Sequence, residues 1–154
     1  MRLLIQRVKE AKVTVENTVS GQIGKGLLVF FAVHKDDTLQ AVPYLAEKLL
    51  HLRVFSDSEG KMNLSLKDLD GEVLLVSQFT LYGNCSKGRR PDFLQSAPPD
   101  FALEAYHKLI EELQKKLSKV ETGRFGAHME VQLTNDGPVT FLLEKEPLAK
   151  TGPR

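Results

Sequence analysis

The sequence contains no tryptophan and only one cysteine, Cys85. A single thiol excludes an intrachain disulfide framework and a zinc site built from several cysteines, and it fits a reducing compartment. Long apolar runs are also missing, because no stretch approaches the roughly 18 residues that span a bilayer. Arg7 and Lys9 interrupt the first apolar segment too early for a signal peptide. We therefore expect a cytoplasmic protein with no membrane-bound part.

An excess of charge of either sign is absent as well, since the net charge is +1 over 154 residues. A protein that binds duplex nucleic acid by bulk electrostatics is usually much more basic. Any contact with nucleic acid must therefore come from a local patch, and no DNA partner is expected. Aromatic residues make up 7% of the chain, which does not favour a large aromatic binding face. The length and a hydrophobic fraction of 42% fit one ordered domain with a real core.

Familiar catalytic signatures are missing too. There is no G-x-S-x-G elbow and no phosphate-binding glycine loop. The histidines show no metal-ligand spacing, so we expect neither a metal site nor a cofactor. They are His34, His51, His107 and His128. Cys85 lies near Lys87 and Arg89, which favour a thiolate, but no histidine lies close to it in sequence. A thiol hydrolase built on Cys85 stays open as one alternative.

Apolar patterning predicts seven to nine strands and two main helices. The strand-like segments are residues 3–8, 12–16, 19–23, 27–33, 53–55, 72–76, 120–122, 129–133 and 139–143. Helical spacing follows candidate N-caps at 36–38, but Pro43 is best placed in a first turn and so favours a later start. A second helix follows the cap Asp100. Strands and helices do not alternate regularly, so a doubly wound fold is not expected. We predict a single α+β domain over residues 1–145 with curved or packed, barrel-like mixed β-sheets, followed by a polar tail at 146–154.

One polar segment, residues 77–83, leaves an apolar strand and enters a long loop at 82–100 that is rich in Gly, Pro and Ser. A loop of that length in a compact domain is usually functional or mobile. Its Ser, Gln and Thr side chains and backbone N–H groups suit the mouth of a pocket. The alternative is a strand terminus whose polar side chains satisfy a turn.

A second polar segment, residues 134–140, lies between two predicted strands. Its Asn-Asp-Gly-Pro sequence is a strong turn signal, and a hairpin loop is the simplest interpretation. The Gly137–Pro138 bond allows a second interpretation, because a cis peptide costs little before proline. A cis bond aims two successive carbonyls in an unusual direction, where they could hold an ammonium group.

Three smaller features have two interpretations each. The basic cluster Lys87-Gly88-Arg89-Arg90 could grip phosphates or could be an ordinary solvated loop. Phe125 and Met129 lie four residues apart and could clamp an unpaired base or pack in the core. Arg7 stands among apolar neighbours and either ties down carbonyls of a nearby loop or faces water.

Taken together, these segments resemble the D-aminoacyl-tRNA deacylase family. Ser77-Gln78-Phe79-Thr80 matches the first family signature, and residues 135–140 match the second. The likeness also includes residues 5–8, 26–29, 87–91 and 122–129. It covers about residues 1–144 in order and at family-like spacing. The Ser-Gln-Phe form, rather than Pro-Gln-Ala, resembles the main branch of these enzymes.

The resemblance implies an enzyme that hydrolyses the ester between a D-amino acid, or glycine, and the 3′ CCA end of tRNA. It also implies a homodimer with active sites at the subunit interface, where a cis Gly137–Pro138 segment of one subunit enters the pocket of the other. The two carbonyls would hold the α-ammonium and block an L side chain, so that chirality is tested by exclusion. Arg7 would steady this segment, and Asn135 belongs to the same chiral-selection group.

The chemistry implied by the resemblance needs no triad. Backbone N–H groups of Phe79 and Thr80 would form an oxyanion hole, an effect of about 3 kcal/mol per donor. Ser77 and Gln78 would organise that pocket. Water would be the nucleophile, assisted by the 2′-hydroxyl of the terminal ribose, and Thr80 would act mainly through its backbone.

The resemblance also implies how the RNA is held. Phe125 and Met129 would flank the terminal adenine, and the long-loop cations Lys87, Arg89 and Arg90 would bind tRNA phosphates. The partners expected are therefore an aminoacylated tRNA and a second copy of the chain. A non-catalytic module that binds RNA ends through the same loops is the alternative from a different functional class.

Overall fold

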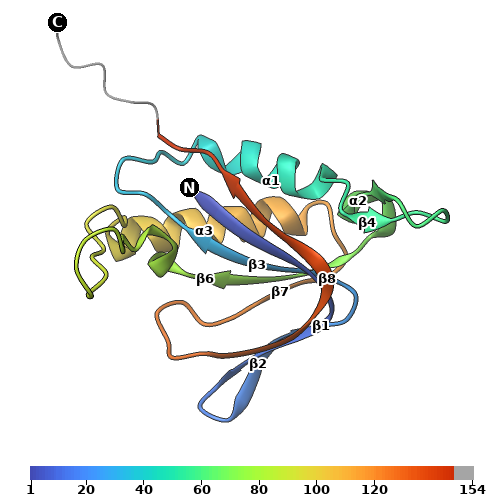
Figure 1. Cartoon of the computed structure of the whole chain (residues 1–154), viewed down its shortest axis with the longest axis horizontal. Coiled ribbons are helices and arrows are strands. Elements are labelled where there is room, and N and C mark those ends of the chain that lie inside the picture. Colours follow the sequence, from blue (N-terminus) through green and yellow to red (C-terminus); the bar gives the residue numbers. More distant parts are fainter. Residues whose placement is uncertain (148–154) are drawn as a thin grey trace, which may run out of the picture.

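A computed structural model describes residues 1–147, and its main feature is one strongly curved six-stranded sheet (Figure 1). The strands of this sheet are β1 (Arg2–Val15), β2 (Thr18–Ile23), β3 (Gly26–Ala32), β6 (Glu72–Ser77), β7 (Val120–Thr122) and β8 (Glu130–Glu144). A two-stranded sheet consists of β4 (Phe55–Ser56) and β5 (Met62–Leu64). The helices are α1 (Ala41–His51), α2 (Leu66–Leu69), α3 (Pro99–Gln114) and the 3₁₀ helix η1 (Phe79–Tyr82). Within residues 1–147, no helix is long and apolar enough to cross a membrane.

The long strand β1 organises the sheet because it pairs with three other strands. Its first half pairs with β3, from Arg2↔Ala32 to Val8↔Gly26, and its second half pairs with β2. Strand β8 runs antiparallel along the other edge of β1. The sheet then continues from β3 through the parallel strands β6 and β7.

The sheet curls until its two ends nearly meet. Ser20 on β2 donates a hydrogen bond from Oγ to the carbonyl of Thr122 on β7, with the two oxygens 3.1 Å apart. A Cβ atom at Gly21 would lie 2.6 Å from that same carbonyl oxygen, so glycine permits the close approach. The predicted α+β class with a barrel-like mixed sheet and two main helices is therefore confirmed.

Two separate hydrophobic cores explain the apolar pattern of the central strands. Helices α1 and α3 cover one face of the sheet (Figure 1), where they pack on alternate residues of β1, β3 and β6. The opposite residues of the same strands fill the inside of the curl with β2. In β3, Leu27 and Val29 belong to the helix-covered core and Leu28 belongs to the inner core. The continuous apolar run at 27–33 thus reflects burial on both faces.

Several predicted strand boundaries were wrong. The segments at 3–8 and 12–16 form one strand, because the exposed residues between them still pair with β8. The segments at 129–133 and 139–143 also form one strand, so residues 134–138 are not a hairpin loop. Between the pairs Gln6↔Thr140 and Val8↔Asn135, five residue steps along β8 face two along β1, so β8 has a large bulge there.

Helix starts also differ in detail from the prediction. Pro43 lies in the first turn of α1, as expected, but the N-cap is Gln40 and not residues 36–38. Pro98 caps α3 and Pro99 is its first residue, so Asp100 lies inside the first turn and is not the cap. The short helix α2 was not predicted, although Ser65 and Asp68 form its capping box. Of the polar tail predicted at 146–154, residues 148–154 lie outside the described part of the chain.

Candidate active site

A pocket opens where two parallel strands end side by side. Strands β3 and β6 are parallel, with Phe31 opposite Ser77 at their carboxyl ends. The backbone N–H of Gln78 donates to the carbonyl of Phe31 at 2.7 Å, and the chain then turns into η1. The carboxyl ends of parallel strands are a common place for ligands, because the chain leaves the sheet there and exposes loop ends.

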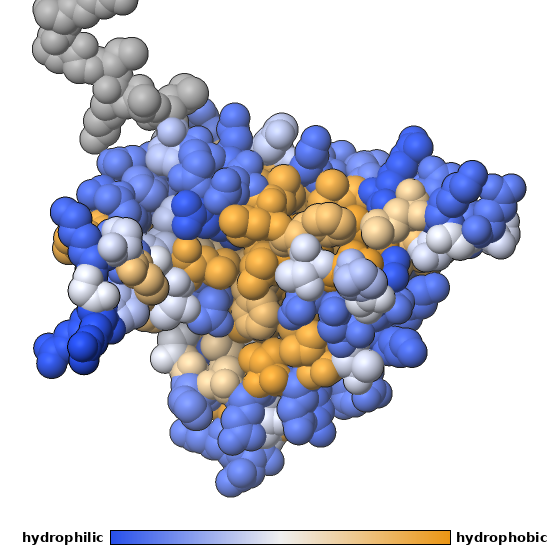
Figure 2. Space-filling model, viewed as in Figure 1, coloured by the Kyte–Doolittle hydropathy of each residue, from blue (hydrophilic) through white to orange (hydrophobic). Residues whose placement is uncertain are grey.

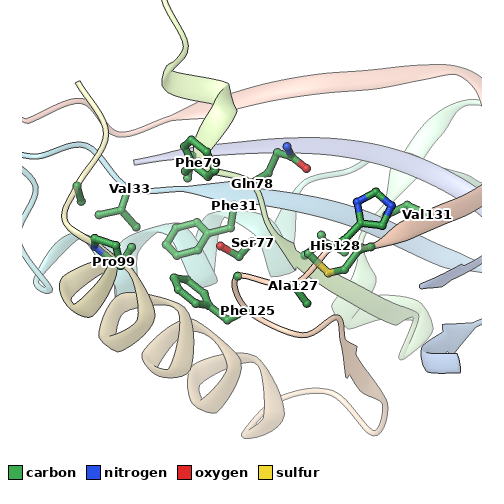
Figure 3. A pocket seen from close by; sticks show the side chains of 16 residues that line it. Phe31, Val33, Ser77, Gln78, Phe79, Pro99, Phe125, Ala127, His128 and Val131 are labelled. Atoms are coloured by element: carbon green, nitrogen blue, oxygen red, sulfur yellow. The ribbon is translucent and has the colours of Figure 1, made fainter. Parts of the chain in front are cut away.

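The pocket has a volume of about 460 Å³ and mostly apolar walls (Figure 3). Its lining comes from β3, from Ser77 to Phe79, from the start of α3 and from the loop before β8. The polar side chains that line it are Ser77, Gln78 and His128. A volume of this size suits a small organic ligand held by a few polar groups.

The 3₁₀ helix η1 presents free backbone donors beside the pocket. The N–H groups of the first helical turn have no partner inside the helix, and here these belong to Phe79 and Thr80. No acceptor within residues 1–147 faces either group. The carbonyls of the helix are held from outside, because Ser96 Oγ donates to the Phe79 oxygen at 3.2 Å and Arg2 Nη1 to the Leu81 oxygen at 2.9 Å.

The side chains of the first signature contact each other. The amide Nε2 of Gln78 donates to the hydroxyl oxygen of Thr80 at 2.5 Å. Ser77, Gln78 and Phe79 line the pocket, whereas Thr80 is exposed and does not. The predicted group of four is thus contiguous, with Thr80 adjoining the pocket and not forming its wall.

Phe125 and Met129 line the pocket and also pack on the core. Both side chains are half-buried, Phe125 against the helix-covered core and Met129 against the inner core. The Phe125 ring lies 5.9 Å from that of Tyr106, whose hydroxyl donates to the Leu75 carbonyl at 2.8 Å. Burial raises the pKa of Tyr106 to about 12, so this phenol remains a neutral donor. A rigid floor therefore supports one side of the pocket.

The Gly137–Pro138 peptide bond is cis and lies in the bulge of β8. Arg7 is buried and braces this bulge: its Nε lies 3.1 Å from both the carbonyl and the carboxylate of Asp136, and its Nη1 donates to the Val54 carbonyl at 2.7 Å. Asn135 braces it from the other side, since Nδ2 donates to the carbonyls of Arg7 at 2.9 Å and Val139 at 3.1 Å. Arg7 therefore ties down carbonyls and does not face water.

Gly137 and Pro138 themselves are exposed and are not part of the pocket wall. Within one chain, the structure therefore does not bring the second signature to the first. The basic residues Lys87, Arg89 and Arg90 are also exposed, on the loop that follows η1, and they do not line the pocket either.

Sequence reasoning missed several pocket residues, of which His128 is the most notable. It is the only titratable side chain among those that line the pocket. The apolar wall also includes Phe31, Val33, Ala97, Pro99, Ala102, Ala127 and Val131. The available signal was the pair of apolar runs at 27–33 and 72–76, whose parallel pairing places their ends at one edge.

Cys85 is exposed and is not part of the pocket wall. In residues 1–147, no three His, Cys, Asp or Glu side chains gather as metal ligands.

Comparison with known proteins identifies the family of the chain. The family model described as D-Tyr-tRNA(Tyr) deacylase matches residues 4–144. A relative from Thermosipho africanus named D-aminoacyl-tRNA deacylase is 57% identical over 146 residues, which is 95% of this chain and 98% of that protein. A relative of the same name from Thermotoga petrophila is 56% identical over 148 residues, covering 96% and 99%.

Two solved structures share the fold. One, described as "c-Myc DNA Unwinding Element Binding Protein", superposes with a TM-score of 0.89 at 39% identity and covers 95% of this chain and 99% of its own. The other, described as a probable eukaryotic D-amino acid tRNA deacylase, has a TM-score of 0.80 at 21% identity, with coverage of 92% and 97%. On the strength of the family match and of relatives aligned over nearly their whole length, the chain belongs to the D-Tyr-tRNA(Tyr) deacylase family.

Proposed function

We propose that the pocket hydrolyses the ester between a D-amino acid, or glycine, and the 3′ end of tRNA, releasing the free amino acid and tRNA. The observation that carries this proposal is the pair of free N–H groups of Phe79 and Thr80 at a pocket of about 460 Å³. The names of the relatives support the substrate class. The protein is then a carboxylic ester hydrolase that takes part in quality control of translation in the cytoplasm.

The two N–H groups serve as the oxyanion hole. As water adds to the ester carbonyl, negative charge develops on its oxygen, and donors fixed in advance stabilise it by about 3 kcal/mol each. Fixing comes from the outside contacts of η1, since Ser96 holds the Phe79 carbonyl and Arg2 holds that of Leu81. An amino acid ester is already labile, so this stabilisation suffices without a metal or a cofactor.

Thr80 contributes through its backbone and not as a nucleophile. Its hydroxyl oxygen accepts a hydrogen bond from Gln78 Nε2. No carboxylate or imidazole within residues 1–147 forms a hydrogen bond with that hydroxyl, so it lacks a base to take its proton. Water attacks instead, assisted by the 2′-hydroxyl of the terminal ribose, while Ser77 and Gln78 shape the pocket. Thr80→Val tests this: retained turnover is expected, whereas loss of turnover together with an acyl-enzyme burst in the native enzyme refutes it.

Chirality is tested by a second subunit. Gly137 and Pro138 are exposed on the braced bulge of β8, away from the pocket of their own chain, so they are free to enter the pocket of a partner. Their carbonyls hold the α-ammonium of the substrate and occupy the space of an L side chain. Glycine has no side chain to exclude and is accepted.

The exposed apolar surface of the sheet supports a homodimer. Figure 2 shows apolar side chains gathered over β1, β3 and β8. On β8, Leu142 is 51% exposed, and Leu4 and Phe30, which lie opposite one another on the neighbouring strands and share its face, are half-buried. Contiguous apolar surface of this kind marks an interaction site on a soluble protein. A second copy of the chain covers it and at the same time delivers the Gly137–Pro138 segment.

The 3′ end of the RNA lies between protein side chains at the pocket. Phe125 and Met129 flank the terminal adenine, since both line the cavity and are held by the core. The exposed cations Lys87, Arg89 and Arg90 meet phosphates of the same strand.

The deciding experiment is a paired hydrolysis assay on D-tyrosyl-tRNA, L-tyrosyl-tRNA and glycyl-tRNA, with a chelator present. Loss of the D and glycyl esters alone is the expected result. If no ester is lost although the RNA binds, the protein is a module that binds RNA ends and the proposal is wrong. Loss of the L ester at the same rate contradicts the exclusion mechanism only.

A further inference from the structure

Two exposed aromatic rings lie next to each other at the mouth of the pocket. Phe79 is 56% exposed and Phe93 is 41% exposed, with ring centroids 5.2 Å apart in an edge-to-face arrangement. Phe79 lines the pocket, so Phe93 continues the same apolar surface outward. Leu94, which follows it, is 75% exposed. Adjoining exposed apolar side chains mark interaction sites, whereas single ones are ordinary on a protein surface.

Backbone hydrogen bonds on both sides of Phe93 fix the position of its ring. An isolated antiparallel bridge joins Asn84 and Asp92, with N–H to carbonyl distances of 2.8 and 3.1 Å. The N–H of Ser96 donates to the Phe93 carbonyl at 3.0 Å. A Cβ atom at Gly83 would lie 3.1 Å from the Phe93 ring, so one side of the ring packs against the backbone of Gly83. One side of the ring is thus held by the protein, and the side chain keeps two-fifths of its surface in solvent.

The bridge also closes a short loop that carries unpaired positive charge. Residues 84–92, which the bridge closes, contain three cations, Lys87, Arg89 and Arg90, and one acid, Asp92. None of the three cations forms an ion pair within residues 1–147. The carboxylate of Asp92 is occupied by the Asn84 amide and the Leu94 N–H. Figure 2 shows a strongly hydrophilic segment projecting where Figure 1 places this loop.

An exposed aromatic ring on the same loop as free cations is an arrangement by which proteins hold unpaired nucleotides. The base stacks on the ring, and the cations neutralise the phosphate that follows. We propose that Phe93 is a stacking platform for the unpaired nucleobase that precedes the 3′-terminal adenosine, with the Lys87–Arg90 loop along its backbone. The proposal rests on the proposed function, which places the terminal nucleotide itself in the pocket. It adds a second RNA subsite outside that pocket.

The test measures stacking directly, without turnover. A hairpin RNA with an unpaired 3′ CCA end carries 2-aminopurine in place of the nucleotide before the terminal adenosine, because the fluorescence of this base falls when it stacks. We expect quenching by the native protein, and a loss of affinity of about tenfold in Phe93→Leu, which keeps an apolar side chain but has no ring face. Phe93→Tyr retains the ring and is expected to restore both signals.

The matched control is Tyr44→Leu. Tyr44 is 48% exposed and also lies near a cation, 5.2 Å from Lys145 Nζ, but it is on α1 and is not part of the pocket wall. Its replacement is expected to change neither quenching nor affinity. Because the chain has no tryptophan, Phe93→Trp adds an independent signal: emission from the single indole should fall when the RNA binds.

The outcomes separate this proposal from the one on which it rests. If the native protein hydrolyses no ester, the proposed function is wrong. The quenching of 2-aminopurine then still shows whether Phe93 stacks on the nucleobase. Native affinity and quenching in Phe93→Leu would overturn the platform. So would a change of oligomeric state in Phe93→Leu, measured by light scattering, with RNA binding intact, because the ring would then cover a second subunit. A folding defect in Phe93→Leu is detected by circular dichroism, and the Phe93→Trp signal then gives the answer.

Discussion

Replacing Arg7 with methionine is expected to destabilise the fold by about 2–4 kcal/mol. Methionine keeps much of the apolar stem but no donor. The carbonyl of Val54, a residue that is 5% exposed, then loses its donor at 2.7 Å, and an unsatisfied buried acceptor costs about 1–3 kcal/mol. The contacts with Asp136 add less, roughly 1 kcal/mol, because its side chain is 37% exposed and partly screened by solvent.

Urea unfolding and thermal melts measure this loss. For a chain of this length, 1 kcal/mol shifts Tm by roughly 2–4 °C, so we expect Tm to fall by roughly 5–15 °C. The matched control is Arg53→Met, since Arg53 is exposed and its amide contact with Asn63 is 3.4 Å long. That change should stay within about 0.5 kcal/mol. Equal stability of the two variants would refute the assignment of Arg7 as the brace of the β8 bulge.

The same variant should also lose activity while it is folded. Without Arg7, the bulge that carries Gly137 and Pro138 loses its contacts to the Asp136 carbonyl and carboxylate. A displacement of about 1 Å at a reacting site can cost roughly a hundredfold in rate. We expect D-tyrosyl-tRNA hydrolysis, measured well below the melting transition, to fall by about tenfold to a hundredfold.

Three further predictions concern other positions. Gly137→Ala should lower the rate of D-ester hydrolysis by about tenfold or more. The added Cβ atom would lie 2.6 Å from Oδ1 of Asn135, and the amide of Asn135 is held in place by its hydrogen bonds to two carbonyls. Gly24→Ala is the control, because the atom nearest to its Cβ would be 3.8 Å away. Cys85→Ser should leave the hydrolysis rate unchanged, and a dead variant would favour the thiol hydrolase. The side-chain and backbone hydrogen bonds of Ser118 hold the pKa of Asp70 below its usual 3.8. Asp70 therefore stabilises the fold above that pH, and the contribution is lost as the pH falls through the lowered pKa. In acid titrations, the stability of Asp70→Asn should converge with that of the native protein as this happens.

Local pattern was enough to predict the central strands and the long helices. The run at 27–33 is apolar because both faces of β3 are buried, and the run at 72–76 follows the same logic. The spacing of apolar residues and the local composition predict such elements directly, because the hydrophobicity of each residue indicates whether it is buried. The same holds for α1, whose Pro43 fits the first turn, where its missing N–H is harmless.

Features that depend on distant partners were not predictable in the same way. Residues 134–138 have strong local turn chemistry, yet pairing with β1 keeps them in a strand and converts the turn into a bulge. His128 and the first residues of α3 line the pocket because the curvature of the sheet brings these distant segments together. Resemblance to a family supplied the two signatures, and the structure adds that one chain keeps them apart.

The pairing of β1 with β8 has a consequence for synthesis on the ribosome. Strand β1 is made first, but its neighbour along one whole edge is the last strand of the domain, with Arg2 opposite Glu144. Until that segment leaves the exit tunnel, one row of backbone donors and acceptors on β1 stays unpaired. Unpaired strand edges on unfinished chains are prone to associate with one another. The sheet is therefore complete only after β8 has emerged, and until then the nascent chain keeps an edge at which it can associate with other chains.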